Sequence, residues 1–249
     1  MRNLADRDRR RMRCEVVLSR SEPLPEADCW LVIDILRATT TICAFFDRGG
    51  ERLYPAATIE EAFALRDRLA EAGPRPILMG ERNALPPDGF DLGNSPLELA
   101  ALDLAGRTDA VMATTNGTAA LLKAAASDTP VLPVCARNAA ATAAAVIDLE
   151  RIGILCAGRE GASSLDDCAC AGLLVERLSE RGAELGDGAI LALAAWRDGG
   201  RDLAALLARS VHGRRLVALG FERDLAFAAE IDASGAVLAL ESGAASRIV

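Results

Sequence analysis

One acidic and one basic side chain follow the apolar run of residues 30–33. Asp34 comes directly after that run, Arg37 comes three residues later, and three threonines beginning at Thr39 lead into a second apolar segment. The first run is typical of a buried strand and the second of an amphipathic helix. Open α/β sheets bind ligands beyond the carboxyl ends of their strands, and helix starts favour negative charge. We therefore expect an anion site here, with Asp34 and Arg37 as catalytic candidates and Arg37 and Thr39 as substrate-binding residues.

Polar residues recur where other predicted strands end. They are Glu81 after the strand 76–79; Thr114, Thr115, Asn116, Gly117 and Thr118 after the strand 109–113; Arg137 and Asn138 after 131–135; and Gly158 after 152–156. The long irregular loop 83–96 adds Asn94. If the strands are parallel, these ends lie along one edge of the sheet. We expect the residues other than Glu81 to bind an anionic substrate there.

The 114–118 turn has the composition of a phosphate-binding loop, because a glycine permits close backbone approach and hydroxyls and amides can face an anion. The chain has neither the GxxxxGK[ST] motif of a P-loop nor the GxGxxG motif of a dinucleotide site. Both absences argue against a bound nucleotide.

Four acidic residues are candidates for binding a divalent cation: Asp34, Glu81, Asp166 and Asp167. Mg²⁺ prefers such oxygen ligands and keeps several of its waters. Asp166 and Asp167 stand early in a predicted helix, so an N-cap or a surface ion pair is the alternative role for each. A structural zinc site is not expected, since the chain has one histidine and no CxxC pair.

Two further side chains could take part in catalysis. Cys156, at a strand end, could be a nucleophile if nearby cations lowered its pKa, although the six other cysteines show that this chain also uses Cys in apolar segments. His212 is the only imidazole and could act as a general acid or base, or could simply lie at the surface near the start of a helix. The residues alone leave both pairs of alternatives open.

The composition limits the partners of this chain. Its net charge is -8 and its pI about 4.9, which argues against a nucleic-acid surface but permits a local pocket for a small anion. Seven cysteines without a spaced framework fit a cytoplasmic protein with free thiols. No apolar run reaches the ~18 residues that span a bilayer, so no membrane contact is expected.

Repeated strand–turn–helix units without polar linkers predict an α/β fold, namely a three-layer α/β/α sandwich with a largely parallel or mixed sheet. We expect a disordered extension over residues 1–11 and a single α/β domain over 12–249, with a division into two lobes near residue 107 as the alternative. The alanine-rich helices suit packing in a homodimer.

Five motifs together resemble the 2-phosphosulfolactate phosphatase (ComB) family, and they occur in the family's order over residues 14–249. They are VIDILRATTT, GERNALPPDGFDLGNSP, TTNGTAAL, ILCAGREGASSLDD and SVHGRRLVALGFERDL. The chain departs from the family pattern at Asp166, where the family has Glu, which puts that metal ligand in question.

The resemblance implies a Mg²⁺-dependent phosphatase that converts 2-phospho-3-sulfolactate to 3-sulfolactate, a step toward coenzyme M. Such a substrate carries a phosphate, a sulfonate and a carboxylate on three carbons, which fits the expected cluster of anion-binding residues. Attack by a metal-activated water is the favoured mechanism, and a phosphoenzyme on Cys156 or Asp34 is the alternative. A non-catalytic protein that binds small polyanions on the same scaffold is the alternative function.

Overall fold

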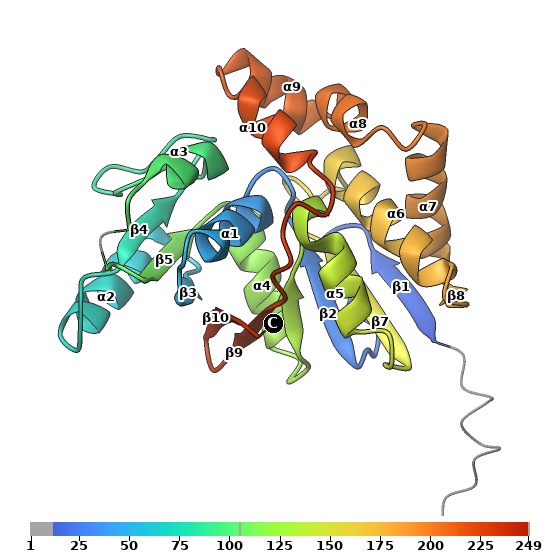
Figure 1. Cartoon of the computed structure of the whole chain (residues 1–249), viewed down its shortest axis with the longest axis horizontal. Helices are drawn as coiled ribbons and strands as arrows, with labels where there is room; N and C mark the ends of the chain where they lie inside the picture. The colour runs from blue at the N-terminus through green and yellow to red at the C-terminus, as the bar shows by residue number, and fades with distance from the viewer. Residues whose placement is uncertain (1–11, 105, 249) are drawn as a thin grey trace, which may run out of the picture.

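The computed structural model describes residues 12–104 and 106–248, which form a mixed sheet flanked by helices (Figure 1). Within these residues the sheet has ten strands in the order β4-β5-β3-β10-β9-β6-β2-β7-β1-β8. The strands are β1 (Arg13–Val17), β2 (Cys29–Ile33), β3 (Arg52–Pro55), β4 (Ile77–Gly80), β5 (Asp109–Ala113), β6 (Val131–Pro133), β7 (Arg151–Cys156), β8 (Glu184–Leu185), β9 (Leu238–Glu241) and β10 (Ala244–Arg247). The α/β fold and the mixed sheet predicted from the sequence are confirmed.

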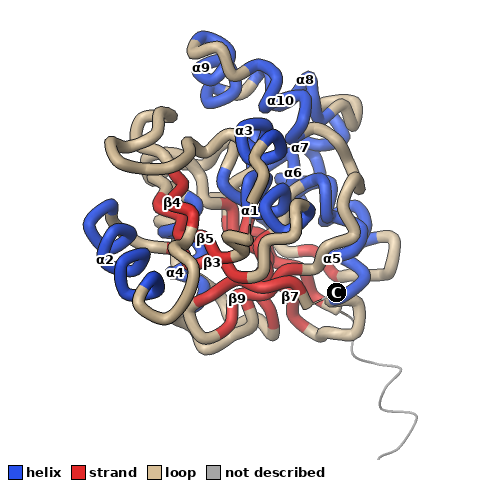
Figure 2. The backbone as a smooth tube through the Cα atoms, turned by 60° about the vertical axis from the view of Figure 1, so that its left-hand side comes forward, coloured by secondary structure: helices blue, strands red, loops and turns tan. Residues whose placement is uncertain are grey.

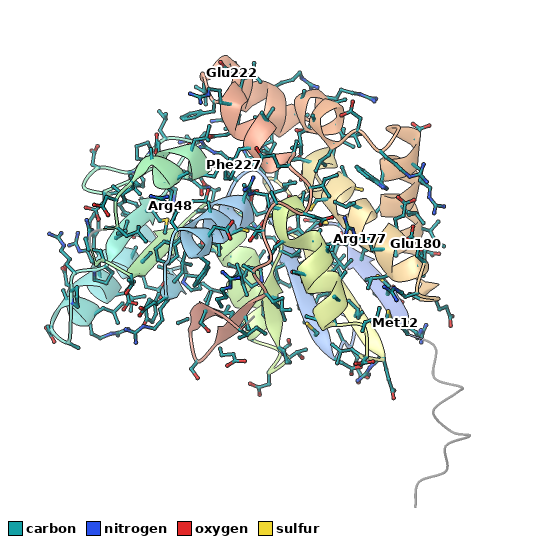
Figure 3. The ribbon with its side chains drawn as sticks, viewed as in Figure 1. Met12, Arg48, Arg177, Glu180, Glu222 and Phe227 are labelled. Carbon is teal, nitrogen blue, oxygen red and sulfur yellow. The ribbon has the colours of Figure 1, made fainter. Side chains whose placement is uncertain are left out.

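Helices connect most of these strands. They are α1 (Ala38–Asp47), α2 (Ile59–Ala70), α3 (Pro96–Ala101), α4 (Gly117–Ala125), α5 (Ala139–Ala145), α6 (Leu165–Ser179), α7 (Asp187–Asp198), α8 (Leu203–Arg209), α9 (Val211–Ala218) and α10 (Glu222–Ala228), with the 3-10 helix η2 (Ala136–Asn138) before α5. Figure 2 shows the strands in the interior with helices on either side of them. The expected extension over residues 1–11 lies outside the described residues.

The direction of the strands reverses across the β9–β10 hairpin. Strands β2, β6, β7, β1 and β8 run parallel to one another, as do β3, β4 and β5. Strand β9 is antiparallel to β6, and β10 is antiparallel to both β9 and β3. The sheet therefore consists of two parallel halves of opposite direction. The sequence signalled only one strand after residue 230, so it predicted neither the hairpin nor this reversal.

Helix α4 nevertheless brings the carboxyl ends of the two halves together. It leaves the end of β5 and leads to the start of β6, so it runs antiparallel to the neighbouring strand β2. Its first turn consequently lies at the carboxyl end of β2, where Asp34 stands. This placement satisfies the expectation that the polar strand ends converge, although the strands are not all parallel.

The two faces of β2 pack into different cores, as a central sheet layer requires. Leu31 and Ile33 belong to a core that includes Leu174 of α6, whereas Trp30 and Val32 belong to one that includes Leu121 of α4. All six side chains are almost fully buried. Because β2 buries both faces, its sequence is a continuous apolar run rather than an alternating one.

Short-range sequence patterns explain where two of the helices begin. The Thr58 hydroxyl accepts a hydrogen bond from the Glu61 N–H and caps α2, and Ser95 caps α3 in the same way through Glu98, with Pro96 at the first helical position. One strand was predicted too long, because β6 ends at Pro133 and Cys135 already begins η2. No helix of the described residues is long and apolar enough to cross a membrane.

Candidate active site

The carboxylate of Asp34 lies against the first turn of α4. A β-carbon at Gly117 would stand only 2.7 Å from Asp34 Oδ2, so the two residues are in close contact. The loop that carries Asp34 is fixed by Thr39, whose N–H donates to the Asp34 carbonyl and whose hydroxyl accepts from the Asp34 N–H. Thr39 thus positions the carboxylate and is not itself exposed to a ligand, since it is almost fully buried.

Three acidic groups and the histidine surround this point. Burial raises the pKa of Asp34 to about 6; His212 lowers it, and the nearby charges of Glu81 and Asp166 raise it. The pKa of Asp167 is likewise raised well above its usual value by burial and by the charges of Asp166 and Asp34. Acids from the ends of β2 and β4 and from the start of α6 therefore share one region, as the sequence predicted.

Asp166 has an unused hydrogen-bond acceptor at this site. Its side chain is 2% exposed, and its Oδ1 is buried without a hydrogen-bond partner. Its Oδ2 lies 3.6 Å from Nδ1 of His212 on α9. A buried carboxylate oxygen without a donor is costly, so an unpaired one suggests a ligand or a cation.

Asp167 has a structural role instead. Its Oδ1 accepts from the Ile35 N–H at 3.0 Å, and its Oδ2 accepts from the Gly158 N–H at 3.0 Å and from the Ser164 hydroxyl at 3.2 Å. These bonds join the loops after β2 and β7 to the start of α6. The Gly158 backbone is thus occupied, with φ at +65° and no room for a β-carbon, which would lie 2.3 Å from the Ala162 carbonyl oxygen.

Glu81 connects β4 to the 114–118 turn. Its Oε1 accepts from the Thr115 N–H at 2.7 Å, and its Oε2 accepts from the Ala84 N–H at 2.9 Å. Thr114 and Thr118 close the turn through bonds between each hydroxyl and the other's N–H. Both hydroxyls are therefore internal to the turn, and Thr115, Asn116 and Gly117 are the members of it that remain nearest to Asp34 and Glu81.

Comparison with known proteins shows which family the chain belongs to. A model of the 2-phosphosulpholactate phosphatase family matches residues 18–243. A Thermus thermophilus protein named probable 2-phosphosulfolactate phosphatase is 40% identical over 241 residues, covering 96% of this chain and 98% of the relative. Proteins of the same name from Deinococcus radiodurans and Thermotoga maritima are 40% and 36% identical, covering 90% and 92% of this chain and 93% and 96% of the relatives.

The chain belongs to the 2-phosphosulpholactate phosphatase family. As a member it is an enzyme, a phosphoric monoester hydrolase. The family match extends over the loops that carry Asp34, Glu81, Gly117, Asp166 and His212, so the cluster described above is its candidate active site.

Two arginines that the sequence placed in the phosphatase site as anion ligands are already paired with carboxylates. Arg37 donates to Asp224 Oδ2 at 2.7 Å and to the Ala84 carbonyl, and it is 3% exposed. Arg137 pairs with Glu230 and lies over the ring of Phe227. Both guanidinium groups thus anchor the segment around α10, and the Nε of Arg137 is buried without a partner. The substrate-binding role expected for them stays a prediction.

Asn138 and Asn94 also differ from expectation. Asn138 is fully buried and bonds only to backbone, accepting from the Cys135 N–H and donating to the carbonyls of Pro133 and Ala236, so it supports the corner after β6. Asn94 is 4% exposed, its carbonyl accepts from the Thr41 hydroxyl, and its Oδ1 has no partner. Only Asn94 therefore retains a free polar atom for a ligand.

The thiol of Cys156 is unsuited to nucleophilic attack in this phosphatase. Burial raises its pKa well above the usual value, and the charge of Asp167 raises it further. A nucleophilic cysteine needs the opposite shift, because the thiolate is the reactive form. Cys156 packs at the end of β7 and is fully buried, which corrects the catalytic role weighed for it.

The acids fit Mg²⁺ better than a closed metal centre. Across residues 12–104 and 106–248 no group of three or more His, Cys, Asp or Glu side chains is close enough to hold a metal alone. Mg²⁺ is commonly bound by one or two carboxylates together with substrate phosphate and water. Asp34 and the unpartnered Oδ1 of Asp166 suit that pattern, whereas both oxygens of Asp167 already accept hydrogen bonds.

Sequence reasoning missed Arg20, which follows β1. Its Nη2 donates to Asn116 Oδ1 at 3.1 Å, and its N–H donates to the Ala157 carbonyl, so it lies between the ends of β7 and the start of α4. Arg20 comes three residues after the end of β1, and Arg37 comes four residues after the end of β2. A search for polar residues just after each predicted strand would therefore have found Arg20 as well.

Proposed function

We propose that this phosphatase hydrolyses 2-phospho-3-sulfolactate to 3-sulfolactate and phosphate and that the reaction depends on Mg²⁺. The names of the relatives support this choice of substrate. The main structural support for the proposal is the contact of Asp34 with Gly117. This contact brings a buried carboxylate next to a helix start at which N–H groups can bind an anion.

Asp34 and Asp166 are the residues that would hold Mg²⁺, with Glu81 beside them. An ion held there would neutralise charge on the phosphoryl oxygens and would favour attack by water. The loops fix these carboxylates before substrate arrives, since Thr39 and Thr115 each bond to an acid or its backbone. Positioning of this kind is the main contribution that a protein makes to phosphoryl transfer.

The first turn of α4 and His212 supply the remaining chemistry. The backbone N–H groups at Asn116 and Gly117 face the phosphoryl group beside Asp34. His212 presents Nδ1 to Asp166, which leaves Nε2 to donate a proton to the ester oxygen as its bond to phosphorus breaks. With this proton sulfolactate leaves as an alcohol, which is a better leaving group than its alkoxide.

We also propose that the reaction takes place in the cytoplasm as a step toward coenzyme M. The seven cysteines are all free thiols, and most of them are buried, which suits a reducing compartment.

Phosphate release from synthetic 2-phospho-3-sulfolactate tests the proposal directly. We expect turnover with Mg²⁺, none after EDTA, and recovery when Mg²⁺ is restored. A protein whose melting temperature rises with the substrate but which releases no phosphate would instead be a polyanion-binding member of the fold. Full turnover in EDTA would contradict the metal requirement while leaving the substrate assignment standing.

A further inference from the structure

Three arginines stand beyond the carboxyl ends of strands β1, β2 and β6, and their charges are balanced differently. Arg37 is paired with Asp224 and Arg137 with Glu230. Among the residues that the structure describes, Arg20 forms no ion pair, and its side chain donates a hydrogen bond to the neutral amide of Asn116. Of these three arginines, Arg20 is the one whose positive charge is not balanced by a carboxylate.

The guanidinium of Arg20 is also incompletely hydrogen-bonded. Its Nε is buried and has no partner, although Nη2 is bonded to Asn116. A buried charged donor left unpaired is unfavourable, and such a group is explained by a ligand that completes its bonds. The Nε–H of a guanidinium and one N–H of the adjacent Nη2 present a fork that matches two oxygens of one anion, and Nη2 carries two N–H bonds, of which Asn116 accepts one.

Contacts of Arg20 and its neighbours place this fork beside the active site. Asn116 immediately precedes Gly117, which contacts Asp34. Lys123 of α4 donates to the backbone carbonyls of Arg20, at 2.6 Å, and Glu22, and so ties the 19–22 turn to the same helix. On the other side the Ser19 hydroxyl donates to the Gly161 carbonyl at 2.9 Å. The turn is therefore fixed to both α4 and the loop after β7.

We propose that Arg20 binds the sulfonate of the substrate and thereby selects for it. This inference rests on the proposed function. The phosphate and the carboxylate share one carbon, so both stay near Asp34 and the helix start, whereas the sulfonate stands one carbon farther out. The sulfonate needs a positive charge of its own, and the guanidinium of Arg20, which is bonded to the residue before Gly117, provides one. Lys123 is then a positioning residue that fixes the backbone from which Arg20 extends.

The test compares 2-phospho-3-sulfolactate with 2-phospholactate, which lacks only the sulfonate. For Arg20→Gln we expect kcat/KM on the sulfonated substrate to fall roughly ten- to hundredfold, mainly through KM. On 2-phospholactate it should change by less than about twofold, which also shows that the variant is folded. Arg20→Lys should recover part of the loss, and Lys123→Met should lower the ratio of the two activities by a smaller factor.

Arg159→Gln is the matched control, because Arg159 lies in the loop after β7 and is already paired with Glu160. It should leave the ratio of the two activities unchanged. Inhibition by the product 3-sulfolactate gives a binding measurement, and its inhibition constant should rise for Arg20→Gln by the factor seen in KM.

Equal losses on both substrates would overturn the inference, since they would place Arg20 on the phosphate or the carboxylate. An unchanged ratio would overturn it as well. Failure of the wild type to release phosphate from either compound would instead refute the proposed function itself, and the sulfonate assignment would fall with it.

Discussion

Asp34 and Gly117 are in contact although 83 residues separate them along the chain. A β-carbon at Gly117 would lie 2.7 Å from Asp34 Oδ2 and 2.5 Å from the β-carbon of Ala38. Since Gly117 is the first residue of α4, the absence of a side chain there lets the helix start approach the carboxylate.

Gly117→Ala should therefore push Asp34 out of place. We expect kcat to fall by at least tenfold and the free energy of unfolding to fall by about 1 to 3 kcal/mol, as in other overpacked sites. Steady-state kinetics and urea unfolding measure the two effects. Gly73→Ala is the control, because a β-carbon there meets nothing within 4 Å, and an equal effect at Gly73 would contradict this account.

Asp34→Asn should abolish turnover without unfolding the protein. Burial raises the pKa of Asp34 from 3.8 to about 6, so the folded state retains a proton that the unfolded chain has lost between these values. The stability from this group is fully present below pH 4 and is lost as the pH rises through 6. Without metal at pH 8 the variant should be more stable than the wild type by about 3 kcal/mol.

Urea unfolding at pH 4 and pH 8 measures that difference. It should be small at pH 4, where the wild-type carboxyl is protonated in the folded state and about half protonated in the unfolded chain. Asp198→Asn, at an exposed position of α7, should change neither activity nor its pH dependence. A variant that is less stable than the wild type at pH 8 would show that the ionised carboxylate stabilises the fold.

Asp166→Asn should remove the response of the protein to Mg²⁺. The unpartnered Oδ1 of Asp166 is the atom that we assign to the ion, and an amide is a much weaker ligand for it. We expect Mg²⁺ to raise the melting temperature of the wild type and of Asp198→Asn but not of Asp166→Asn. An undiminished shift in Asp166→Asn would place the ion elsewhere.

Cys156→Ala should keep kcat within about threefold of the wild-type value. The buried thiol stays protonated because burial raises its pKa, so it cannot carry a phosphoryl group. Rapid quenching with substrate labelled in the phosphate should leave the wild-type protein unlabelled. A stable label on Cys156, or inactivity of a folded Cys156→Ala variant, would establish a phosphoenzyme.

Arg37→Met should destabilise the protein by about 3 kcal/mol, because it leaves Asp224 buried without its partner. The double variant Arg37→Met/Asp224→Leu should recover much of that loss, which urea unfolding measures. If Arg37 only anchors α10, the folded double variant keeps its KM within about threefold. A large rise in KM at unchanged stability would return Arg37 to the substrate.

The sequence alone determined the parts of this protein that depend on near neighbours. Thr58 and Ser95 each cap a helix through a residue three positions away, a spacing that is visible in the sequence. The apolar run before Asp34 marked a strand buried on both faces, and the polar strand ends marked the acids of the site. These signals work because strand ends and helix caps are decided by a few adjacent residues.

The tertiary structure decided which of those polar residues are free to act. Arg37 and Arg20 look alike in the sequence, but Arg37 meets Asp224, 187 residues later, and Arg20 meets only an amide. In the same way Asp167 is saturated by three donors from two loops, while the adjacent Asp166 keeps an unpaired oxygen. A charge is available to a substrate only when the fold supplies no internal partner, and such partners come from positions that no local pattern reveals.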